Sequence, residues 1–260
     1  MAKSKILPTR LFTGIPVVVG STEQIVESIF HRARIRSSRG CDVHLLEMNG
    51  LAIATRSPDF ESLLSSACMV VADGRWLQFF TRWTIVPLTQ TRGEDLFRAV
   101  LAGDGGVPLD SYFLGSTPSE LGRLAEVIER DFPLTTIVGM ESPPFREFTD
   151  AEVLGFAKRI SDSGAQIVWI GISTPRQDFL ATKLSELTGS VVVAVGAAFD
   201  FLSRNKPSAP HWMRRFGVEW LFRLVSEPTR LWRRYLGGGL VFLLRVFLHR
   251  KSDVEKLYET

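Results

Sequence analysis

The sequence has few cysteines and no apolar run long enough to span a membrane. Of its 260 residues only two are cysteines, Cys41 and Cys68, and both lie in apolar stretches typical of strands. A disulfide scaffold is therefore not expected, and a reducing compartment fits better. The longest apolar candidate, 236–248, falls short of the ~18–20 residues that a spanning helix needs, and it contains Arg245. The first residues show no secretory signal.

Motifs of several common enzyme classes are also missing. The chain contains no Gly-x-Gly-x-x-Gly fingerprint and no Walker loop, which disfavours dinucleotide-dependent and ATP-hydrolysing enzymes. It has no Gly-x-Ser-x-Gly elbow for a nucleophilic serine. The four histidines are scattered, and no Asp-x-Asp pair occurs that would hold a divalent ion on a nucleotide diphosphate. The sequence therefore predicts no metal site.

Charge is distributed unevenly along the chain. Residues 206–260 hold 11 Lys and Arg against 5 Asp and Glu, a net charge of +6, whereas residues 1–205 have a net charge of −3. This asymmetry predicts an anionic partner for the C-terminal part, for which membrane lipid, a phosphorylated substrate and nucleic acid all qualify. The core is not basic and carries no helix-turn-helix, zinc or RNA-binding signature. A nucleic-acid-binding protein is therefore the weaker alternative.

The first two-thirds of the chain alternates short apolar stretches with amphipathic segments. Strands that are apolar on both faces and separated by such helices predict a Rossmann-like α/β fold, with a mainly parallel sheet and helices on both faces. We expect this core to span residues 1–205. The predicted strands are 42–48, 68–72, 111–115, 134–140, 166–171 and 190–195, and the predicted helices include 58–67, 150–163, 175–187 and one that begins with a cap at 116–120.

A second region begins at residue 206. The segment 206–210, Lys-Pro-Ser-Ala-Pro, is typical of a linker, and helical segments follow it. We therefore expect residues 206–260 to form a basic helical appendage that binds a membrane. Within the appendage, 240–251 is almost wholly apolar and ends in a basic cluster, as in helices that lie among lipid headgroups. A contact between protein subunits is the alternative for that segment.

Polar or glycine-containing clusters follow several of the predicted strands. In a parallel α/β sheet, ligands bind at the carboxyl ends of the strands. Asp73 follows the strand 68–72, where it can act as a general base or simply cap the next helix. The turn 115–117 can hold a phosphate on its backbone N–H groups, although such turns occur throughout α/β proteins. Further clusters lie at 93–95, 171–178 and 196–200.

Taken in order along the chain, these clusters resemble the WecG/TagA/CpsF glycosyltransferase family. The resemblance covers about residues 10–247 and is densest in the C-terminal third. The matching motifs lie at 72–74 (Ala-Asp-Gly), 93–96, 113–115, 175–178 (Pro-Arg-Gln-Asp), 195–201, 209–215, 218–224 and 227–235.

The resemblance implies an inverting transferase, bound peripherally at the cytoplasmic face of the bacterial inner membrane. Such enzymes move a sugar from a UDP-sugar to a polyprenyl-diphosphate-linked saccharide. Their products feed enterobacterial common antigen, teichoic acid linkage units, capsule or exopolysaccharide. The implied partners are a UDP-sugar, the lipid-linked acceptor and an anionic membrane surface, with no nucleic acid, metal or other cofactor. A homo-oligomer is compatible with the apolar surface of the appendage.

The resemblance also implies roles for individual residues. Asp73 matches the family's general base, a role that it can fill if burial raises its pKa toward neutrality. Arg176, the turn 115–117 and an appendage arginine are candidates to stabilise the departing diphosphate. Any one appendage arginine can instead belong to a solvated surface. The residues that match substrate-binding positions are Asn49, Arg92, Gln177, Asp200, Arg223, Arg230 and Arg233.

Three positions depart from the family pattern. Glu47 stands where a threonine is usual, Gln90 where an arginine is usual, and Trp76 where a glycine is usual. All three lie around the expected pocket, so the resemblance does not identify the donor; glucose, N-acetylmannosamine and its uronic acid all occur in the family. We expect a neutral hexose or N-acetylhexosamine. A sugar-nucleotide-binding regulator with a degraded site remains an alternative.

Overall fold

A computed structural model describes residues 7–35, 39–73, 75–82 and 86–203. It also describes six residues further along the chain, Met213, Phe222, Val225, Val241, Arg245 and Val246. The predicted boundary at 205/206 and most of the predicted appendage therefore lie outside the described residues.

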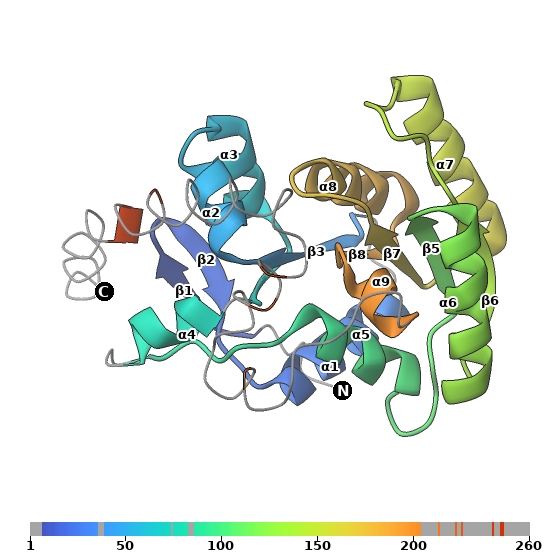
Figure 1. Cartoon of the computed structure of the whole chain (residues 1–260), viewed down its shortest axis with the longest axis horizontal. Coiled ribbons are helices and arrows are strands. Elements are labelled where there is room, and N and C mark those ends of the chain that lie inside the picture. The colour runs from blue at the N-terminus through green and yellow to red at the C-terminus, as the bar shows by residue number, and fades with distance from the viewer. Residues whose placement is uncertain are drawn as a thin grey trace.

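A six-stranded parallel sheet forms the centre of the fold, as the sequence predicted (Figure 1). Across the sheet the strand order is β4-β3-β8-β7-β5-β6. A separate antiparallel pair, β1 (Thr9–Phe12) and β2 (Ile15–Val18), was not anticipated. The strands of the main sheet are β3 (Cys41–Leu46), β4 (Met69–Ala72), β5 (Ser111–Gly115), β6 (Ile137–Glu141), β7 (Ile167–Gly171) and β8 (Val191–Ala194).

Helices cover both faces of this sheet, and a third group surrounds the β1–β2 pair (Figure 1). One face carries α1 (Thr22–Ile35), α5 (Gly93–Ala102), α6 (Pro118–Asp131) and α9 (Ala198–Leu202). The other face carries α7 (Asp150–Ser163) and α8 (Arg176–Thr188). Beside β1 and β2 lie α2 (Met48–Ala54), α3 (Pro58–Ser66) and α4 (Arg75–Thr81).

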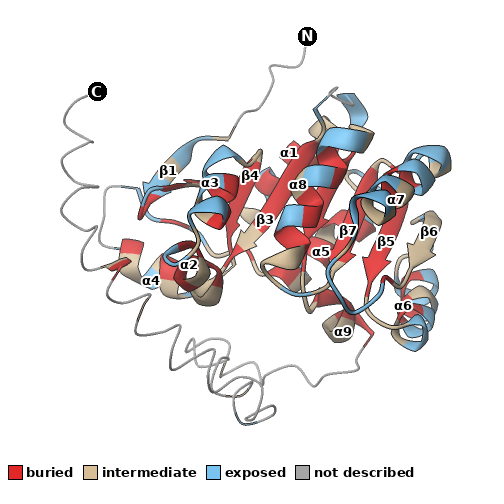
Figure 2. Cartoon of the chain, turned by 90° about the horizontal axis from the view of Figure 1, so that it is seen from above, coloured by how far each residue is buried: buried red, intermediate tan, exposed pale blue. Residues whose placement is uncertain are grey.

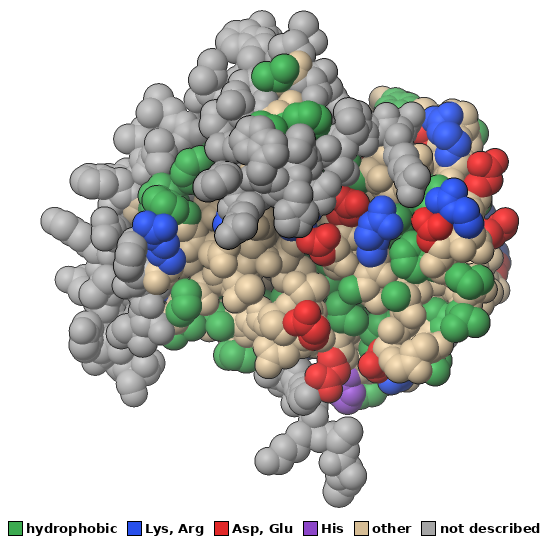
Figure 3. Space-filling view, turned by 60° about the horizontal axis from the view of Figure 1, so that its bottom comes forward, with side chains coloured by type: hydrophobic (Ala, Val, Ile, Leu, Met, Phe, Trp, Pro, Cys, Tyr) green, Lys and Arg blue, Asp and Glu red, His purple; other side chains and the backbone are tan. Residues whose placement is uncertain are grey.

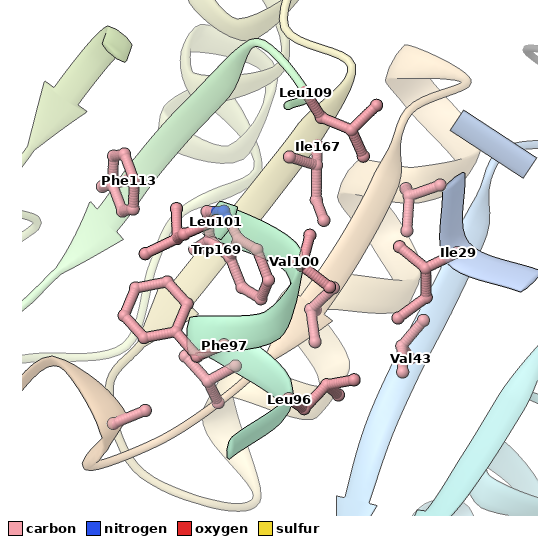
Figure 4. Packing of buried hydrophobic residues seen from close by; sticks show 14 of the residues in the cluster. Ile29, Val43, Leu96, Phe97, Val100, Leu101, Leu109, Phe113, Ile167 and Trp169 are labelled. Atoms are coloured by element: carbon pink, nitrogen blue, oxygen red, sulfur yellow. The ribbon is translucent and has the colours of Figure 1, made fainter. Parts of the chain in front are cut away.

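Most strands of the main sheet are buried on both sides, whereas the edge strand β6 is only partly buried and the outer surfaces of the helices are exposed (Figure 2). In the largest apolar cluster, Phe97 of α5 packs edge-on against Trp169 of β7, with the ring centroids 4.6 Å apart (Figure 4). Phe97 also contacts Phe113 of β5. Because Trp169, Phe97 and Phe113 are fully buried, this cluster fixes α5 against the centre of the sheet.

Two predicted strands differ from the structure at one end. The strand predicted at 42–48 ends at Leu46, and α2 begins at Met48, which makes Asn49 helical. The strand predicted at 134–140 begins only at Ile137, because Thr135 N–H binds the carbonyl of Phe132 in a turn that follows α6. Strand ends depend on which backbone groups find partners, and apolar character alone does not reveal this.

The sequence disfavoured a disulfide scaffold, yet the two cysteines are paired. Cys41 and Cys68 form a disulfide, with their Cα atoms 5.3 Å apart. Cys41 begins β3 and Cys68 directly precedes β4, and these two strands are parallel neighbours. The pairing of β3 with β4 therefore brings the two side chains together, which the number of cysteines did not reveal.

Candidate active site

A pocket of about 550 Å³ lies at the carboxyl ends of the parallel strands. Residues that follow all six strands of the main sheet contribute to its walls. The pocket thus brings together the clusters that were predicted separately from the sequence. Four of the predicted site residues line it: Asp73, Arg92, Gln177 and Asp200.

Asp73 directly follows β4, and its carboxylate faces the start of α5. Its Oδ1 accepts a hydrogen bond from the backbone N–H of Gly93, at 3.0 Å. The Gln90 side chain donates to the backbone carbonyl of Asp73, at 2.7 Å. Asp73 therefore binds the first turn of α5, a helix that begins 20 residues later, and its carboxylate has a fixed orientation at the pocket wall.

Arg92 is the N-cap residue of α5 and lies beside acidic side chains of the same helix. Its guanidinium is 3.8 Å from Glu94 and 3.9 Å from Asp95. Glu94 also accepts a hydrogen bond from Arg98, at 3.2 Å. Because the Arg92 side chain is 18% exposed and lines the pocket, it can offer its charge to an anionic ligand there.

Gln177 is the most deeply buried of the predicted pocket residues, with 4% of its surface exposed. Its Nε2 donates to the hydroxyl of Thr174 at 3.1 Å, which fixes the orientation of the amide. Its Oε1 is buried and has no hydrogen-bond partner among the described residues. A buried acceptor without a partner is costly, so the site is suited to a ligand hydroxyl or N–H at this point.

Arg176 begins α8 and also lines the pocket. Its guanidinium lies over the ring of Phe148, 4.9 Å from the ring centroid, and its Nε is 3.4 Å from Glu147. It also donates to the backbone carbonyl of Arg146. These contacts hold the guanidinium group at the pocket wall, where 24% of the side chain is exposed.

Asp200 lies in α9, and the turn that precedes this helix also lines the pocket. Gly196 in that turn has φ +57°, a left-handed conformation that favours glycine. On the neighbouring strand, a Cβ atom at Gly171 would lie 2.4 Å from the Phe199 ring. Glycine at position 171 therefore lets α9 pack closely on the strand ends, and this places Asp200 at the pocket.

Asn49 is the one described member of the predicted set that is absent from the pocket wall. It lies in α2, and Glu47, which precedes that helix, lines the pocket instead. The predicted appendage residues Arg223, Arg230 and Arg233 lie outside the described residues. The charged side chains among the described lining residues are five carboxylates and two guanidinium groups: Glu47, Asp73, Glu94, Glu120, Asp200, Arg92 and Arg176.

The turn 115–117 does not offer the phosphate site that the sequence suggested. The Glu120 carboxylate accepts hydrogen bonds from the backbone N–H of Thr117, at 3.2 Å, and from the side chains of Ser116 and Thr117. This capping box places a negative charge where a phosphate would bind. An anionic ligand in the pocket is therefore better served by Arg92 and Arg176.

A fully buried ionic network lies between β3 and α8, and sequence reasoning missed it. His44 contacts Asp178 through Nδ1, at 2.9 Å, and Asp42 through Nε2, at 3.0 Å. Although burial favours the neutral imidazole, the hydrogen bonds to Asp178 and Asp42 raise the pKa of His44 to about 9. The only sequence signal was the polar pair Asp42 and His44, two residues apart and thus on one face of a strand.

The same network holds Asp42 in its ionised form. Burial opposes ionisation, but the hydrogen bond from His44 and its charge lower the pKa of Asp42 to about 2. The backbone N–H of Cys68 and the hydroxyl of Thr182 donate to the same carboxylate, at 2.8 and 2.7 Å. Asp42 therefore links β3 both to the start of β4 and to α8.

On one face of the molecule, the described charges of both signs are interspersed. In the face seen in Figure 3, the described acidic and basic side chains lie side by side around the centre of the molecule, with no single large basic field among them.

No group of three or more His, Cys, Asp and Glu in the described part of the chain is arranged to hold a metal ion. Within that same part, no helix combines the length and apolar character needed to cross a bilayer.

Comparison with known proteins identifies the family. The profile described as "Glycosyl transferase WecG/TagA/CpsF family" matches residues 10–256, nearly the whole chain. The chain belongs to this glycosyltransferase family. A relative from Bacillus spizizenii, named N-acetylglucosaminyldiphosphoundecaprenol N-acetyl-beta-D-mannosaminyltransferase, is 30% identical over 207 residues, which cover 79% of this chain and 78% of that protein. The predicted resemblance is thereby confirmed.

Membership of the WecG/TagA/CpsF family establishes the class of reaction as glycosyl transfer. It also gives the pocket a context, since the motifs that carried the resemblance include Asp73 and the segment 175–178, which meet at that pocket. The contact between Asp73 and the start of α5 is compatible with a catalytic role for the same carboxylate. The bond from Gly93 uses one carboxylate oxygen and orients the group toward the pocket.

Proposed function

We propose that this glycosyltransferase moves a sugar from a UDP-sugar to a polyprenyl-diphosphate-linked saccharide, with inversion at the anomeric carbon, in the synthesis of bacterial surface polysaccharide. The observation that carries the proposal is the fixed Asp73 carboxylate at the wall of the strand-end pocket, in a chain of this family. The name of the Bacillus relative supports a lipid-linked acceptor, because that protein acts on N-acetylglucosaminyldiphosphoundecaprenol.

In the proposed reaction, Asp73 accepts the proton of the acceptor hydroxyl while that oxygen attacks the anomeric carbon of the donor. A new C–O glycosidic bond forms as the bond between the anomeric carbon and the UDP oxygen breaks, and UDP leaves with the electron pair. Arg92 and Arg176 line the same pocket and can stabilise the charge that develops on the diphosphate. Gln177 Oε1 supplies a buried acceptor for a donor hydroxyl or N–H.

The donor sugar in this proposal is a neutral hexose or N-acetylhexosamine. The described pocket wall carries five carboxylates and two guanidinium groups. If both guanidinium groups bind the diphosphate, the charged groups left to face the sugar are carboxylates. They disfavour a sugar that is itself an anion. One of these five carboxylates is Glu47, at the position where a threonine is usual in the family.

The proposal includes the appendage. Arg223, Arg230 and Arg233 complete the site over the lipid diphosphate, and residues 206–260 hold the enzyme peripherally at the cytoplasmic face of the inner membrane. The net charge of +6 over this segment supports binding to anionic lipid, to which each basic residue near the surface contributes about 1 kcal/mol. Flotation with anionic liposomes tests this part, and an intact protein that stays unbound at low salt contradicts it.

The activity is tested by incubating the purified protein with a panel of UDP-sugars and polyprenyl-diphosphate-linked N-acetylglucosamine, and weighing the lipid products by mass spectrometry. We expect a mass increase of one hexose or N-acetylhexosamine with one donor, and release of an equal amount of UDP. NMR of the product then gives the anomeric configuration, which inversion predicts to be opposite to that of the donor. Absence of product with every donor, from a protein that is folded and bound to vesicles, contradicts the proposal.

A further inference from the structure

The buried network between β3 and α8 joins the centre of the sheet to the helix that begins at the pocket. Asp42 and His44 lie two residues apart on β3, and their side chains meet Asp178 and Thr182, one turn apart on α8. His44 is fully buried, and Asp178 and Asp42 are 3% and 6% exposed. None of these three side chains lines the pocket among its described residues.

With a carboxylate at hydrogen-bond distance on each side, His44 fits this geometry as a donor on both sides. A neutral imidazole has one N–H donor and one acceptor nitrogen, and an acceptor nitrogen at 3.0 Å from a carboxylate oxygen would repel it. With both nitrogens protonated, His44 bridges Asp42 and Asp178 with two charge-assisted hydrogen bonds. The imidazolium thus fixes the Asp178 side chain in distance and in direction.

Stability alone explains this network poorly. Replacement of buried ionic groups by apolar residues of similar volume is often neutral or stabilising, because desolvation offsets the attraction. Leucine or valine at these positions would pack α8 on the sheet, but apolar contacts are not directional and permit a small rotation of the helix. An ionic bridge allows much less rotation.

Rotation of α8 matters because of the residues next to Asp178. Gln177 directly precedes Asp178, and its buried Oε1 has no hydrogen-bond partner among the described residues. Arg176 comes one residue earlier, at the very start of the helix. Both line the pocket. A change in the direction of Asp178 therefore moves the two α8 side chains that, under the proposed function, bind the donor.

We propose that His44 is a positioning residue for glycosyl transfer: by holding Asp178 it sets the rotation of the first turn of α8, and so places Arg176 and Gln177 against the UDP-sugar. This inference rests on the proposed function for the identity of the ligand. The placement of α8 by His44 and Asp178 is independent of which sugar is transferred.

The test compares three variants on α8. Asp178→Ala removes the acceptor of His44 Nδ1, whereas Asp178→Asn keeps an oxygen in the same place. Thr182→Val, one turn further along, removes the hydroxyl that binds Asp42 but leaves the contact between His44 and Asp178. We expect Asp178→Ala to raise KM for the UDP-sugar about tenfold and to change KM for the lipid acceptor less than about twofold. Asp178→Asn and Thr182→Val should stay within about threefold of wild type for both substrates.

Binding of UDP, measured by calorimetry, gives a second readout that does not depend on turnover. Asp178→Ala should weaken UDP binding about as much as it raises KM for the donor. An Asp178→Ala protein with wild-type KM and UDP affinity overturns the inference, and so does an equal loss in Thr182→Val, which would indicate general packing. If Asp178→Ala does not fold, Asp178→Leu fills the same volume without an acceptor and replaces it. A wild-type protein that neither binds UDP nor transfers sugar instead contradicts the proposed function itself.

Discussion

The side chain of Arg245 contacts the carboxylate of Glu61, although the two residues are 184 positions apart in the sequence. Arg245 is 4% exposed, and it also donates to the backbone carbonyl of Thr13, at 2.8 Å, and to the hydroxyl of Thr55, at 3.1 Å. Next to it, Val246 packs against the apolar cluster around β1 and β2. At these two residues the segment predicted to lie among lipid headgroups is bound to the core.

Replacing Arg245 with Ala should lower the free energy of unfolding by about 2 kcal/mol, because the buried carbonyl of Thr13 loses its donor. Urea titration followed by circular dichroism measures this change. Lys158→Ala is the control, since Lys158 is 76% exposed and pairs with Asp162 only at the surface. It should cost less than about 0.5 kcal/mol. Equal stability of the two variants would show that Arg245 does not anchor the segment.

Asp73→Asn should abolish transfer while leaving the protein folded. Asparagine keeps the oxygen that accepts from Gly93 N–H, so the start of α5 stays in place, but it cannot take a proton. We expect kcat to fall about 10²–10⁴-fold, in line with the loss of a general base. Asp104→Asn, beyond the opposite end of α5, is the matched control and should retain full turnover. Near-normal kcat in Asp73→Asn removes Asp73 from the role of base.

The stability of the protein should depend on pH through His44. Its pKa in the folded state is about 9, above the ordinary value of 6.5, so its stabilising contribution is complete below pH 6.5 and disappears as the pH rises through 9. We expect the free energy of unfolding to decrease by a few kcal/mol over that interval. Denaturant titrations at intervals from pH 6 to 10 measure it.

The control for this pH dependence is His31→Gln, on the part-exposed surface of α1, which should keep the wild-type decline. His44→Gln should be less stable at pH 6.5 and lack most of the decline. A wild-type stability that stays level from pH 6.5 to 9 would contradict an imidazolium at position 44.

At the acidic end of the pH range, stability should depend on Asp42. Its pKa is about 2, below its ordinary value of 3.8, so its stabilising contribution is complete above pH 3.8 and is lost as the pH falls toward 2.

Glu47 should select against anionic donors. Its side chain lines the pocket beside other carboxylates, so a uronic acid donor meets repulsion there. We expect Glu47→Thr to raise kcat/KM for the uronic acid form of the preferred UDP-sugar about tenfold, with less than about threefold change for the neutral form. Glu126→Thr, on the exposed surface of α6, is the control and should change neither value. The same preference in Glu47→Thr and wild type would remove Glu47 from donor selection.

Several elements could be predicted because their signals are local. Helix α6 begins where Thr117 and Glu120 form a capping box, with Pro118 in its first turn, and α7 covers the predicted range 150–163. In both helices the cap and the apolar period lie within a few residues of the backbone that they organise. The apolar stretches that became β5 and β7 were found for the same reason.

The contacts that shape the site were less predictable. Asp73 follows its strand as expected, but its partner is the start of α5, because β4 lies at the edge of the sheet next to that helix start. Glu120 fills the turn that was expected to bind phosphate, since the capping box supplies an anion from within the same helix. The bond between Cys41 and Cys68 depends on β3 and β4 being neighbours, which spacing in the sequence does not reveal.

The sequence by itself determined the α/β class, the order of most helices and strands, and the family, because periodicity, caps and motifs are written into consecutive residues. The tertiary structure decided which strand ends meet in one pocket, that Asn49 is left outside its described wall, and that His44 is held between two aspartates. It also decided that Arg245 reaches Glu61. These relations join residues up to 184 positions apart, and they depend on strand order and helix packing, which local patterns do not specify.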